Sequence, residues 1–158
     1  MKLVHAKIDD LNYVNDLYIS VRNTPYCVWN EYYPTFEEIE SDFLASTLYL
    51  VKENDEILGA VSVNPINEMD EIDGFTKVDK PCEIARVVVN PLYQNRKIGA
   101  FMINEIINVL ISKGFDSVRL AVEINHVPAI KLYEKCGFKK VGTHFMYEHN
   151  YYLYEKLF

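Results

Sequence analysis

The sequence predicts a mixed α/β fold in which helices pack on one sheet of several strands. Runs rich in β-branched residues, typical of strands, alternate along the chain with segments whose apolar residues recur at helical spacing. The predicted order of elements is β-α-α-β-β-β-α-β-α-β-β. The 158 residues contain no repeat, linker or low-complexity segment, so we expect residues 1–158 to form a single domain.

The first half of the chain is expected to contain a strand, two helices and a hairpin. Asp9 or Asp10 is expected to cap the first helix, and Thr35 and Glu38 have the spacing of a capping box at the start of the second. The turn residues at 53–55 separate two strand-like runs and predict the hairpin. The expected elements are a strand at 2–7, helices at about 11–21 and 35–45, and strands at 47–52 and 57–63.

The second half begins with an acidic segment, residues 67–80, which is expected to be a loop or a distorted extension of the hairpin. Lys113-Gly114 is expected to end a long helix, and Asn125 to cap the helix that follows. The expected elements are a strand at 84–89, a helix at 97–112, a strand at 118–122, a helix from Asn125 to Cys136-Gly137, and strands at 139–142 and 150–156.

Composition excludes several classes of function. The formal charge of −7 argues against binding nucleic acid or an anionic membrane surface and favours cationic partners. The three cysteines, Cys27, Cys82 and Cys136, are too widely spaced for a disulfide framework or a zinc site, and the four histidines show no metal-ligand spacing. We therefore expect a cytoplasmic protein without a metal, and we expect the cysteines to act as small hydrophobic residues rather than nucleophiles.

The stretch QNRKIGA, residues 94–100, joins the strand at 84–89 to the long helix. A helix start leaves backbone N–H groups unpaired, and the helix dipole adds partial positive charge there. Arg96 and Lys97 add formal charge, while Gly99 and Ala100 are small enough for a ligand to approach. A pyrophosphate site and a plain basic turn both remain open on this stretch alone, and no P-loop or dinucleotide fingerprint is present.

Two motifs resemble those of the GNAT superfamily of N-acetyltransferases. VVVNPLYQNRKIGA is similar to its acetyl-CoA signature, a strand ending V-x-P followed by Q/R-x-x-G-x-G/A at a helix start, with Lys97 in the first glycine position. AIKLYEKCGF resembles a second signature, A-x-x-L/F-Y-x-x-x-G-F. The resemblance implies the GNAT-like acyltransferase fold, acetyl-CoA as cosubstrate, and transfer of its acetyl group to an amine.

The resemblance also implies a set of residues that bind acetyl-CoA. Backbone groups of the strand at 87–89 are expected near the thioester, and Asn125 is expected to hold the pantetheine arm or simply to cap its helix. For Lys97 we expect a right-handed φ in the first helical turn, with its amide or its ammonium available to the pyrophosphate. The expected set is Val87, Val88, Val89, Gln94, Asn95, Arg96, Lys97, Ile98, Gly99, Ala100, Asn125 and Ala129.

Transfer to an amine needs a base, because an alkyl ammonium has a pKa of about 10 and is protonated at neutral pH. Glu83 is the first candidate: it shares one face of its strand with Ala85, Val87 and Val89, and superfamily members often carry a glutamate there. Glu123 is the second candidate. Tyr133 is implied as the acid that protonates the leaving thiolate. A solvent-facing carboxylate and a packing tyrosine are the plainer alternatives for Glu83 and Tyr133.

The acceptor is expected to be a primary amine of a small molecule or a peptide N-terminus. The aromatic residues Tyr26, Trp29 and Tyr32 are candidates for the wall of its pocket, although core packing explains such residues equally well. The tyrosine-rich segment 147–158 suits strand pairing between two subunits, that is, a homodimer. The alternatives to an enzyme are a catalytically weak acyl-CoA-binding sensory module and a structural or partner-binding domain.

Overall fold

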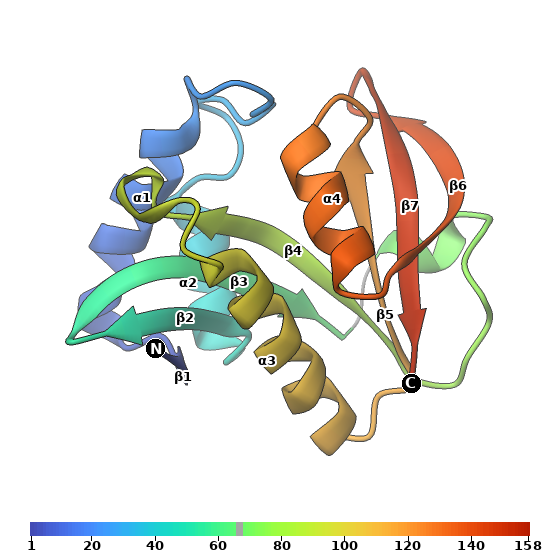
Figure 1. The fold of residues 1–158 in the computed structure, drawn as a ribbon, viewed down its shortest axis with the longest axis horizontal. Coiled ribbons are helices and arrows are strands. Elements are labelled where there is room, and N and C mark those ends of the chain that lie inside the picture. Colours follow the sequence, from blue (N-terminus) through green and yellow to red (C-terminus); the bar gives the residue numbers. More distant parts are fainter. Residues whose placement is uncertain (66–67) are drawn as a thin grey trace. The chain divides into compact units, whose positions relative to one another are not determined.

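The computed structural model describes residues 1–65 and 68–158 (Figure 1). The order of helices and strands agrees with the sequence prediction, and boundaries differ by a few residues. The acidic segment 67–80 contains a short 3-10 turn at Glu68–Glu71, while its residue 67 lies outside the described part. The elements are β1 (Lys2–His5), α1 (Leu11–Val21), α2 (Phe36–Leu44), β2 (Leu48–Glu53), β3 (Glu56–Asn64), β4 (Pro81–Val89), α3 (Ile98–Ser112), β5 (Ser117–Glu123), α4 (Val127–Lys135), β6 (Lys139–Met146) and β7 (His149–Leu157).

The strands form one mixed sheet in the order β1-β2-β3-β4-β5-β7-β6. β4 and β5 run parallel, with Pro81 to Glu83 opposite Ser117 to Arg119. The pairs β1–β2, β2–β3, β5–β7 and β6–β7 are antiparallel. The predicted mixed sheet with helices is therefore confirmed. Among the described residues, no helix is both long and apolar enough to span a bilayer.

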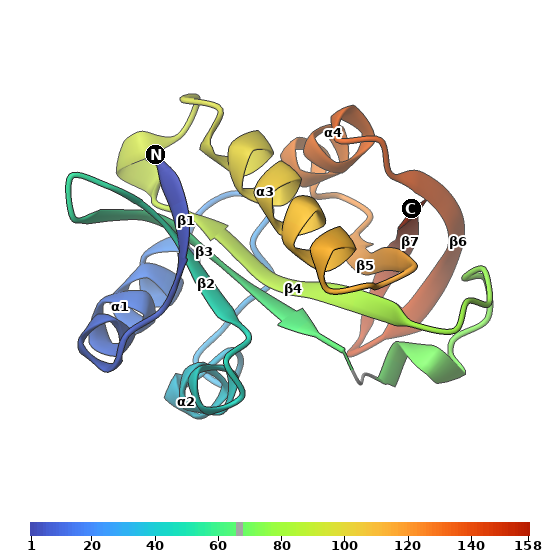
Figure 2. The ribbon, with the colours of Figure 1, turned by 90° about the horizontal axis from the view of Figure 1, so that it is seen from below.

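The contacts divide the chain into two compact units, and the first comprises residues 1–63 and 85–102. Its helices α1 and α2 lie on the same side of the strands β1 to β3 (Figure 2). Apolar residues at helical spacing on α1 meet the inward-facing residues of the strands, as the sequence pattern predicts. This core includes Leu11, Val14, Leu17, Tyr18, Ile39, Leu48, Leu50, Ile57, Ala60 and Val88.

Two of the predicted local signals in the first unit are confirmed. Thr35 and Glu38 form the capping box of α2, with the Thr35 N–H donating to the Glu38 carboxylate at 2.7 Å. Asn54 and Asp55 both have left-handed φ values, 50° and 66°, as a two-residue hairpin turn requires. The cap of α1 differs: Asp10 precedes the helix, but its carboxylate accepts the Lys7 N–H instead of a helical amide.

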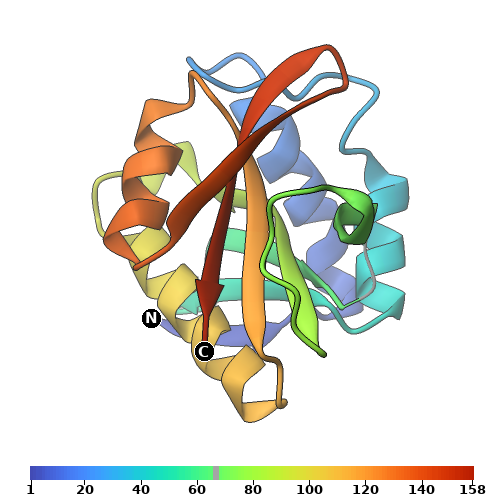
Figure 3. The same ribbon diagram turned by 90° about the vertical axis from the view of Figure 1, so that its right-hand side faces the viewer.

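The second unit comprises residues 64–84 and 103–158. Figure 3 shows β5 (orange) beside β7 and the red hairpin of β6 and β7. Helix α4 is tied to β7 by two hydrogen bonds, from the Tyr154 hydroxyl to Glu134 at 2.8 Å and from the Lys156 ammonium to the Cys136 carbonyl at 2.8 Å. These contacts hold the C-terminal end of α4, the helix that carries Tyr133, against β7.

The loop before β4 is held against β5 and β7 by polar contacts. Glu155 is buried and accepts hydrogen bonds from the Thr76 N–H at 3.0 Å and the Thr76 hydroxyl at 2.6 Å. Arg119, opposite Glu155 on β5, pairs with Asp70 and stacks on the Phe75 ring. The predicted acidic loop is thus partly used as a structural anchor of the second unit.

Candidate functional site

The backbone of β4 bends at Arg86, which has a left-handed φ of 50° within the strand. A side chain in this region costs about 1–2 kcal/mol, so the conformation must be stabilised by its surroundings. Past the bend, the Val88 carbonyl lies 2.8 Å from where a β carbon on Gly59 of β3 would be. β3 can approach β4 this closely only because residue 59 is glycine.

Arg86 is held by a buried ion pair that the sequence pattern does not predict. Its Nε and Nη2 atoms donate to the two carboxylate oxygens of Asp42 on α2, both at 2.9 Å. Asp42 also accepts the Ser62 hydroxyl of β3 at 2.6 Å, and the Arg86 Nη1 atom donates to the Tyr33 hydroxyl at 2.9 Å. Burial alone would lower the pKa of Arg86, but Tyr33 and Asp42 outweigh it and the pKa is raised. The guanidinium therefore stays charged.

The residues after β4 form a short turn that leads into α3. Buried Asn90 accepts the Leu92 N–H at 3.0 Å and donates to the Tyr13 hydroxyl at 3.2 Å. Its backbone N–H bonds to the Leu58 carbonyl at 2.8 Å, which fixes the end of β4 to β3. The turn is thus anchored before the chain reaches residues 94–100.

Lys97 corrects the sequence prediction. Helix α3 begins at Ile98, and Lys97 precedes it with a φ of 60°, not the right-handed value expected. The Lys97 carbonyl accepts the first helical hydrogen bond, from Phe101 at 3.1 Å, so Lys97 is in the N-cap position. Asn95 is left-handed as well, with a φ of 65°. The motif's glycine position therefore does need a left-handed residue, and here a lysine occupies it.

The two cations of this loop differ in their contacts. Arg96 donates to the Glu53 carboxylate at 3.0 Å, and its guanidinium lies over the Tyr93 ring. Lys97 is exposed and has no carboxylate partner in the described part of the chain. The first amides of α3, at Ile98 and Gly99, have no intrahelical acceptor because they open the helix. Of the two cations, Lys97 is thus the one available to an anion.

Glu83 lies in the second unit, on the third residue of β4. Its side chain is half-buried, and the Asn64 side chain donates to its Oε1 atom at 2.9 Å. This contact gives the carboxylate a fixed orientation, as the position of a general base requires. The neighbouring Cys82 is buried, and burial together with the Glu83 charge raises the pKa of its thiol to about 12. A thiol of this kind is inert at neutral pH.

Tyr133 lies in α4 and is buried, with 6% of its surface exposed. Its ring packs edge-on against Phe138, with centroids 5.7 Å apart. Burial and the neighbouring Cys136 raise the pKa of the phenol above its ordinary value, so it keeps its proton. Both its packing and its protonated hydroxyl are compatible with a general acid and equally with a tyrosine that only packs in the core.

The start of α4 corrects a second prediction. His126, not Asn125, caps the helix: its Nδ1 atom accepts the Ala129 N–H at 3.3 Å. Asn125 is exposed, and its backbone and side-chain N–H groups donate to the buried Glu123 carboxylate at 2.7 and 3.0 Å. Glu123, the second candidate for the base, is thus engaged by Asn125. The sequence alone does not mark His126 as the cap, because asparagine is the commoner residue at that position.

The aromatic loop, residues 22–35 of the first unit, has a defined internal structure. Trp29 packs edge-on against Tyr18, with ring centroids 5.2 Å apart, and lies partly buried against the core. Tyr26 and Tyr32 are exposed, Tyr32 by 80%. Of the three predicted acceptor residues, Tyr26 and Tyr32 therefore face solvent, and Trp29 is mainly a packing residue.

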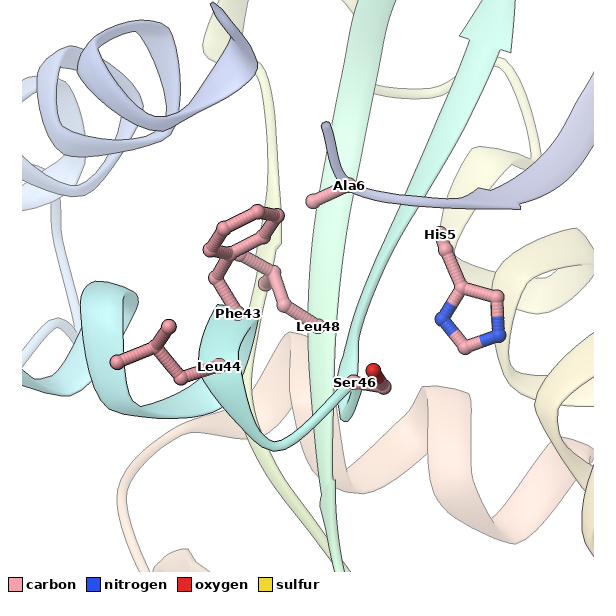
Figure 4. Close-up of a pocket in the computed structure, with 6 residues that line it drawn as sticks. All are labelled: His5, Ala6, Phe43, Leu44, Ser46 and Leu48. Carbon is pink, nitrogen blue, oxygen red and sulfur yellow. The ribbon is translucent and has the colours of Figure 1, made fainter. Parts of the chain in front are cut away.

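A shallow pocket of about 360 Å³ lies in the first unit, and none of the predicted site residues lines it (Figure 4). Four of the six labelled side chains in the figure are apolar, and His5 stacks on Tyr49 with ring centroids 4.3 Å apart. The lining offers no convergent polar groups for a charged ligand. Its residues are His5, Ala6, Phe43, Leu44, Ser46 and Leu48.

The chain is similar to known proteins in both sequence and fold. A sequence profile described as the acetyltransferase (GNAT) family matches residues 14–138. The chain belongs to this family. No curated protein matches the chain in sequence. GNAT acetyltransferases use acetyl-CoA, and the match spans the strand, the loop and Tyr133, where the sequence resemblance was found.

Solved structures confirm the GNAT fold. The ribosomal-protein-alanine N-acetyltransferase of Brucella melitensis is 19% identical, with a TM-score of 0.77 and 100% of both chains covered. The protein yncA of Salmonella typhimurium, solved with its cofactor acetyl-CoA, is 16% identical, with a TM-score of 0.76 over 99% of this chain and 93% of that one. A spermidine N-acetyltransferase SpeG chimera from Vibrio cholerae and hSSAT is 18% identical, with a TM-score of 0.74 over 99% and 94%.

The residues of this GNAT protein fit a ligand that carries phosphate groups. The loop before α3 has two left-handed residues, the unpaired first amides of the helix, and a lysine without a carboxylate partner among the described residues. Gly99 has no side chain to block the first turn. The first unit holds this loop, Val87 to Val89 and the aromatic loop, and the second holds Glu83, Asn125, Ala129 and Tyr133.

Proposed function

We propose that this GNAT protein transfers an acetyl group from acetyl-CoA to a primary amine of a small molecule or peptide by direct attack in a ternary complex. The observation that carries the proposal is the turn with left-handed residues Asn95 and Lys97, which leads directly into the N-terminus of α3. Such a turn presents successive amides to an anion, as a pyrophosphate needs. We also propose that residues 1–158 form a single domain and that the protein is cytoplasmic.

The coenzyme contacts follow from the chemistry of each group. The amides of Ile98, Gly99 and Ala100 would bind the pyrophosphate, and the Lys97 ammonium would add a point charge. Gln94, Asn95 and Arg96 would shape the turn, because Arg96 is engaged with Glu53. The backbone of Val87, Val88 and Val89 would contact the acetyl thioester, and Asn125 and Ala129 at the start of α4 would contact the pantetheine arm.

Glu83 is the proposed general base and Tyr133 the proposed acid. The Asn64 hydrogen bond supports the role of Glu83 by orienting its carboxylate to take a proton from the acceptor ammonium, directly or through water. A phenol with the ordinary pKa of about 10 is already protonated at neutral pH, and burial raises the pKa of Tyr133 further, so its hydroxyl carries the proton that the leaving thiolate needs.

The acceptor class is proposed from charge and from relatives of the same fold. The net charge of −7 favours a cationic amine. One structural neighbour is a spermidine N-acetyltransferase chimera and another a ribosomal-protein-alanine N-acetyltransferase, so a polyamine and a peptide with N-terminal alanine are the first two acceptors to test. Tyr26 and Tyr32 are the proposed acceptor contacts, with Trp29 supporting their loop.

The test is an amine screen that measures CoA release from acetyl-CoA with a thiol reagent. The panel contains spermidine, an alanine-initiated peptide, free amino acids and an aminoglycoside. We expect turnover with at least one of them, and loss of about 100-fold or more in Glu83→Gln. Glu148→Gln, which neutralises an exposed glutamate on the β6–β7 turn, is the matched control and should retain activity.

Two outcomes would contradict the proposal. Binding of acetyl-CoA in calorimetry without turnover on any amine would indicate a sensory acyl-CoA-binding module, and the lysine in the glycine position is the feature that favours this alternative. Absence of acetyl-CoA binding would indicate a structural or partner-binding domain. Full activity in Glu83→Gln would leave the proposed acetyltransferase activity standing but rule out Glu83 as its general base.

A further inference from the structure

The ion pair between Arg86 and Asp42 joins several segments of the first unit at one point. Asp42 belongs to α2, Ser62 to β3, Arg86 to β4 and Tyr33 to the aromatic loop. Each is linked to the guanidinium or to the Asp42 carboxylate by a hydrogen bond of 2.6 to 2.9 Å. The side chains of Arg86 and Asp42 are only 10% and 8% exposed.

This network lies where the backbone of β4 leaves regular strand geometry. Arg86 is the left-handed residue, and it directly precedes Val87. Its torsion angles therefore set the direction of the amides at Val87, Val88 and Val89. Because a two-pronged contact between a guanidinium and a carboxylate fixes both position and orientation, it holds the left-handed conformation in place.

A role confined to stability explains the network poorly. A buried ion pair contributes little to stability compared with apolar residues of the same volume, because desolvation offsets the attraction. Arginine also has no intrinsic preference for the left-handed region, and glycine would adopt it without strain. The ion pair fixes the orientation of the β4 backbone, and a pair of apolar residues in its place would not.

We propose that Arg86 is a positioning residue of the acetyl transfer, which, through its pairing with Asp42, aims the backbone amides of Val87–Val89 at the acetyl carbonyl and anchors the aromatic loop through Tyr33. This inference rests on the proposed function and deepens it. Arg86 touches neither substrate; it acts through the backbone that follows it. The consequence is a preference for acetyl-CoA over CoA, because only acetyl-CoA carries the carbonyl that these amides meet.

The test compares the affinities of CoA and acetyl-CoA by calorimetry in the full chain. The double variant Asp42→Asn/Arg86→Gln removes both buried charges together and so leaves neither unpaired. We expect its Kd for acetyl-CoA to rise about fivefold, the effect of one lost hydrogen bond, and its Kd for CoA to stay within about twofold. The affinity for CoA reports the loop at 94–100, which the variant does not touch.

A second ion pair of the first unit provides the matched control. Lys52 and Asp10 are 2.8 Å apart with side chains 17% and 13% exposed, and neither lies on β4. The double variant Lys52→Gln/Asp10→Asn is expected to lose comparable stability in thermal unfolding and to keep the wild-type ratio of the two affinities. If the neutral pair at positions 42 and 86 does not fold, Arg86→Lys keeps the charge paired without the two-pronged contact and is expected to show the same selective loss.

The outcomes separate this inference from the proposed function. A protein that binds both ligands but shows an unchanged ratio in the folded variants overturns the positioning role while the proposed function stands. Equal weakening for both ligands also overturns it, since this indicates a structural role only. A wild-type protein that binds neither CoA nor acetyl-CoA overturns the proposed function, and the inference with it.

Discussion

The Nδ1 atom of His126 accepts a hydrogen bond from the backbone N–H of Ala129 at 3.3 Å and so caps α4. Only an unprotonated Nδ1 can accept this bond. Burial lowers the pKa of His126 below its ordinary value, partly offset by a backbone hydrogen bond and by Glu123. The start of the helix that carries Tyr133 thus depends on a neutral imidazole.

Acidification should destabilise the protein through His126. The unfolded chain binds a proton at the ordinary histidine pKa of about 6.5, whereas the folded chain binds it only at lower pH. The unfolded state therefore holds more protons in this window, and the free energy of unfolding falls as the pH drops below about 6.5. Urea unfolding from pH 8 to pH 5 measures this. His126→Asn keeps a capping side chain that does not titrate, and it should flatten the difference; an identical pH profile in both proteins would contradict the prediction.

Replacing Lys97 by glycine should stabilise the fold and weaken coenzyme binding at once. Glycine adopts the left-handed φ of 60° without strain, so we expect the free energy of unfolding to rise by about 0.5–1 kcal/mol. Lys97→Ala removes the same ammonium without relieving the backbone, and its stability should not rise. Both variants should bind CoA less tightly, by about three- to tenfold at low salt, because one cation is lost.

Arg96→Ala tests the other cation of the loop at 94–100. Its guanidinium is engaged with Glu53 at 3.0 Å, so we expect a smaller effect on the Kd for CoA than in Lys97→Ala. The measurement is calorimetry at low and moderate salt. If Arg96→Ala weakens binding more than Lys97→Ala does, the assignment of the free cation is wrong.

Removing the Tyr133 hydroxyl should affect the rate and not the fold. No hydrogen bond of this hydroxyl is found among the described residues, so Tyr133→Phe leaves no partner unpaired. We expect kcat to fall about 100-fold, as for a lost general acid, with an unchanged or slightly higher Tm. Tyr154→Phe makes the same chemical change in the same unit but breaks a 2.8 Å bond to Glu134, and it should lower Tm while kcat stays near wild type.

The hydroxyl of Tyr33 should control the acceptor rather than the coenzyme. It accepts the Arg86 hydrogen bond at 2.9 Å and ties the aromatic loop to β4. In Tyr33→Phe we expect the KM for the amine found in the screen to rise about threefold to tenfold, with the KM for acetyl-CoA unchanged. A rise in both constants would indicate a general loss of structure instead.

Periodicity was enough to predict the order of helices and strands. The conformations of the individual site residues were harder to predict, because they depend on contacts with residues far away in the sequence. Nothing in the local sequence marks Arg86 as left-handed, since its partner Asp42 lies 44 residues away on α2. Lys97 was misplaced by one position, because a helix start is defined by φ and not by the apolar pattern. His126 was missed because asparagine is the commoner cap.

The approach of the Val88 carbonyl to Gly59 restricts how β3 can change over evolution. A hydrophobic residue of this strand can be exchanged for another of similar volume at modest cost. At position 59 even alanine would place its β carbon 2.8 Å from a backbone oxygen, and a backbone cannot rotate aside as a side chain does. In a comparison of homologues that keep the bend in β4, we expect position 59 to be the least variable of β3, and a library of all substitutions there should return glycine alone.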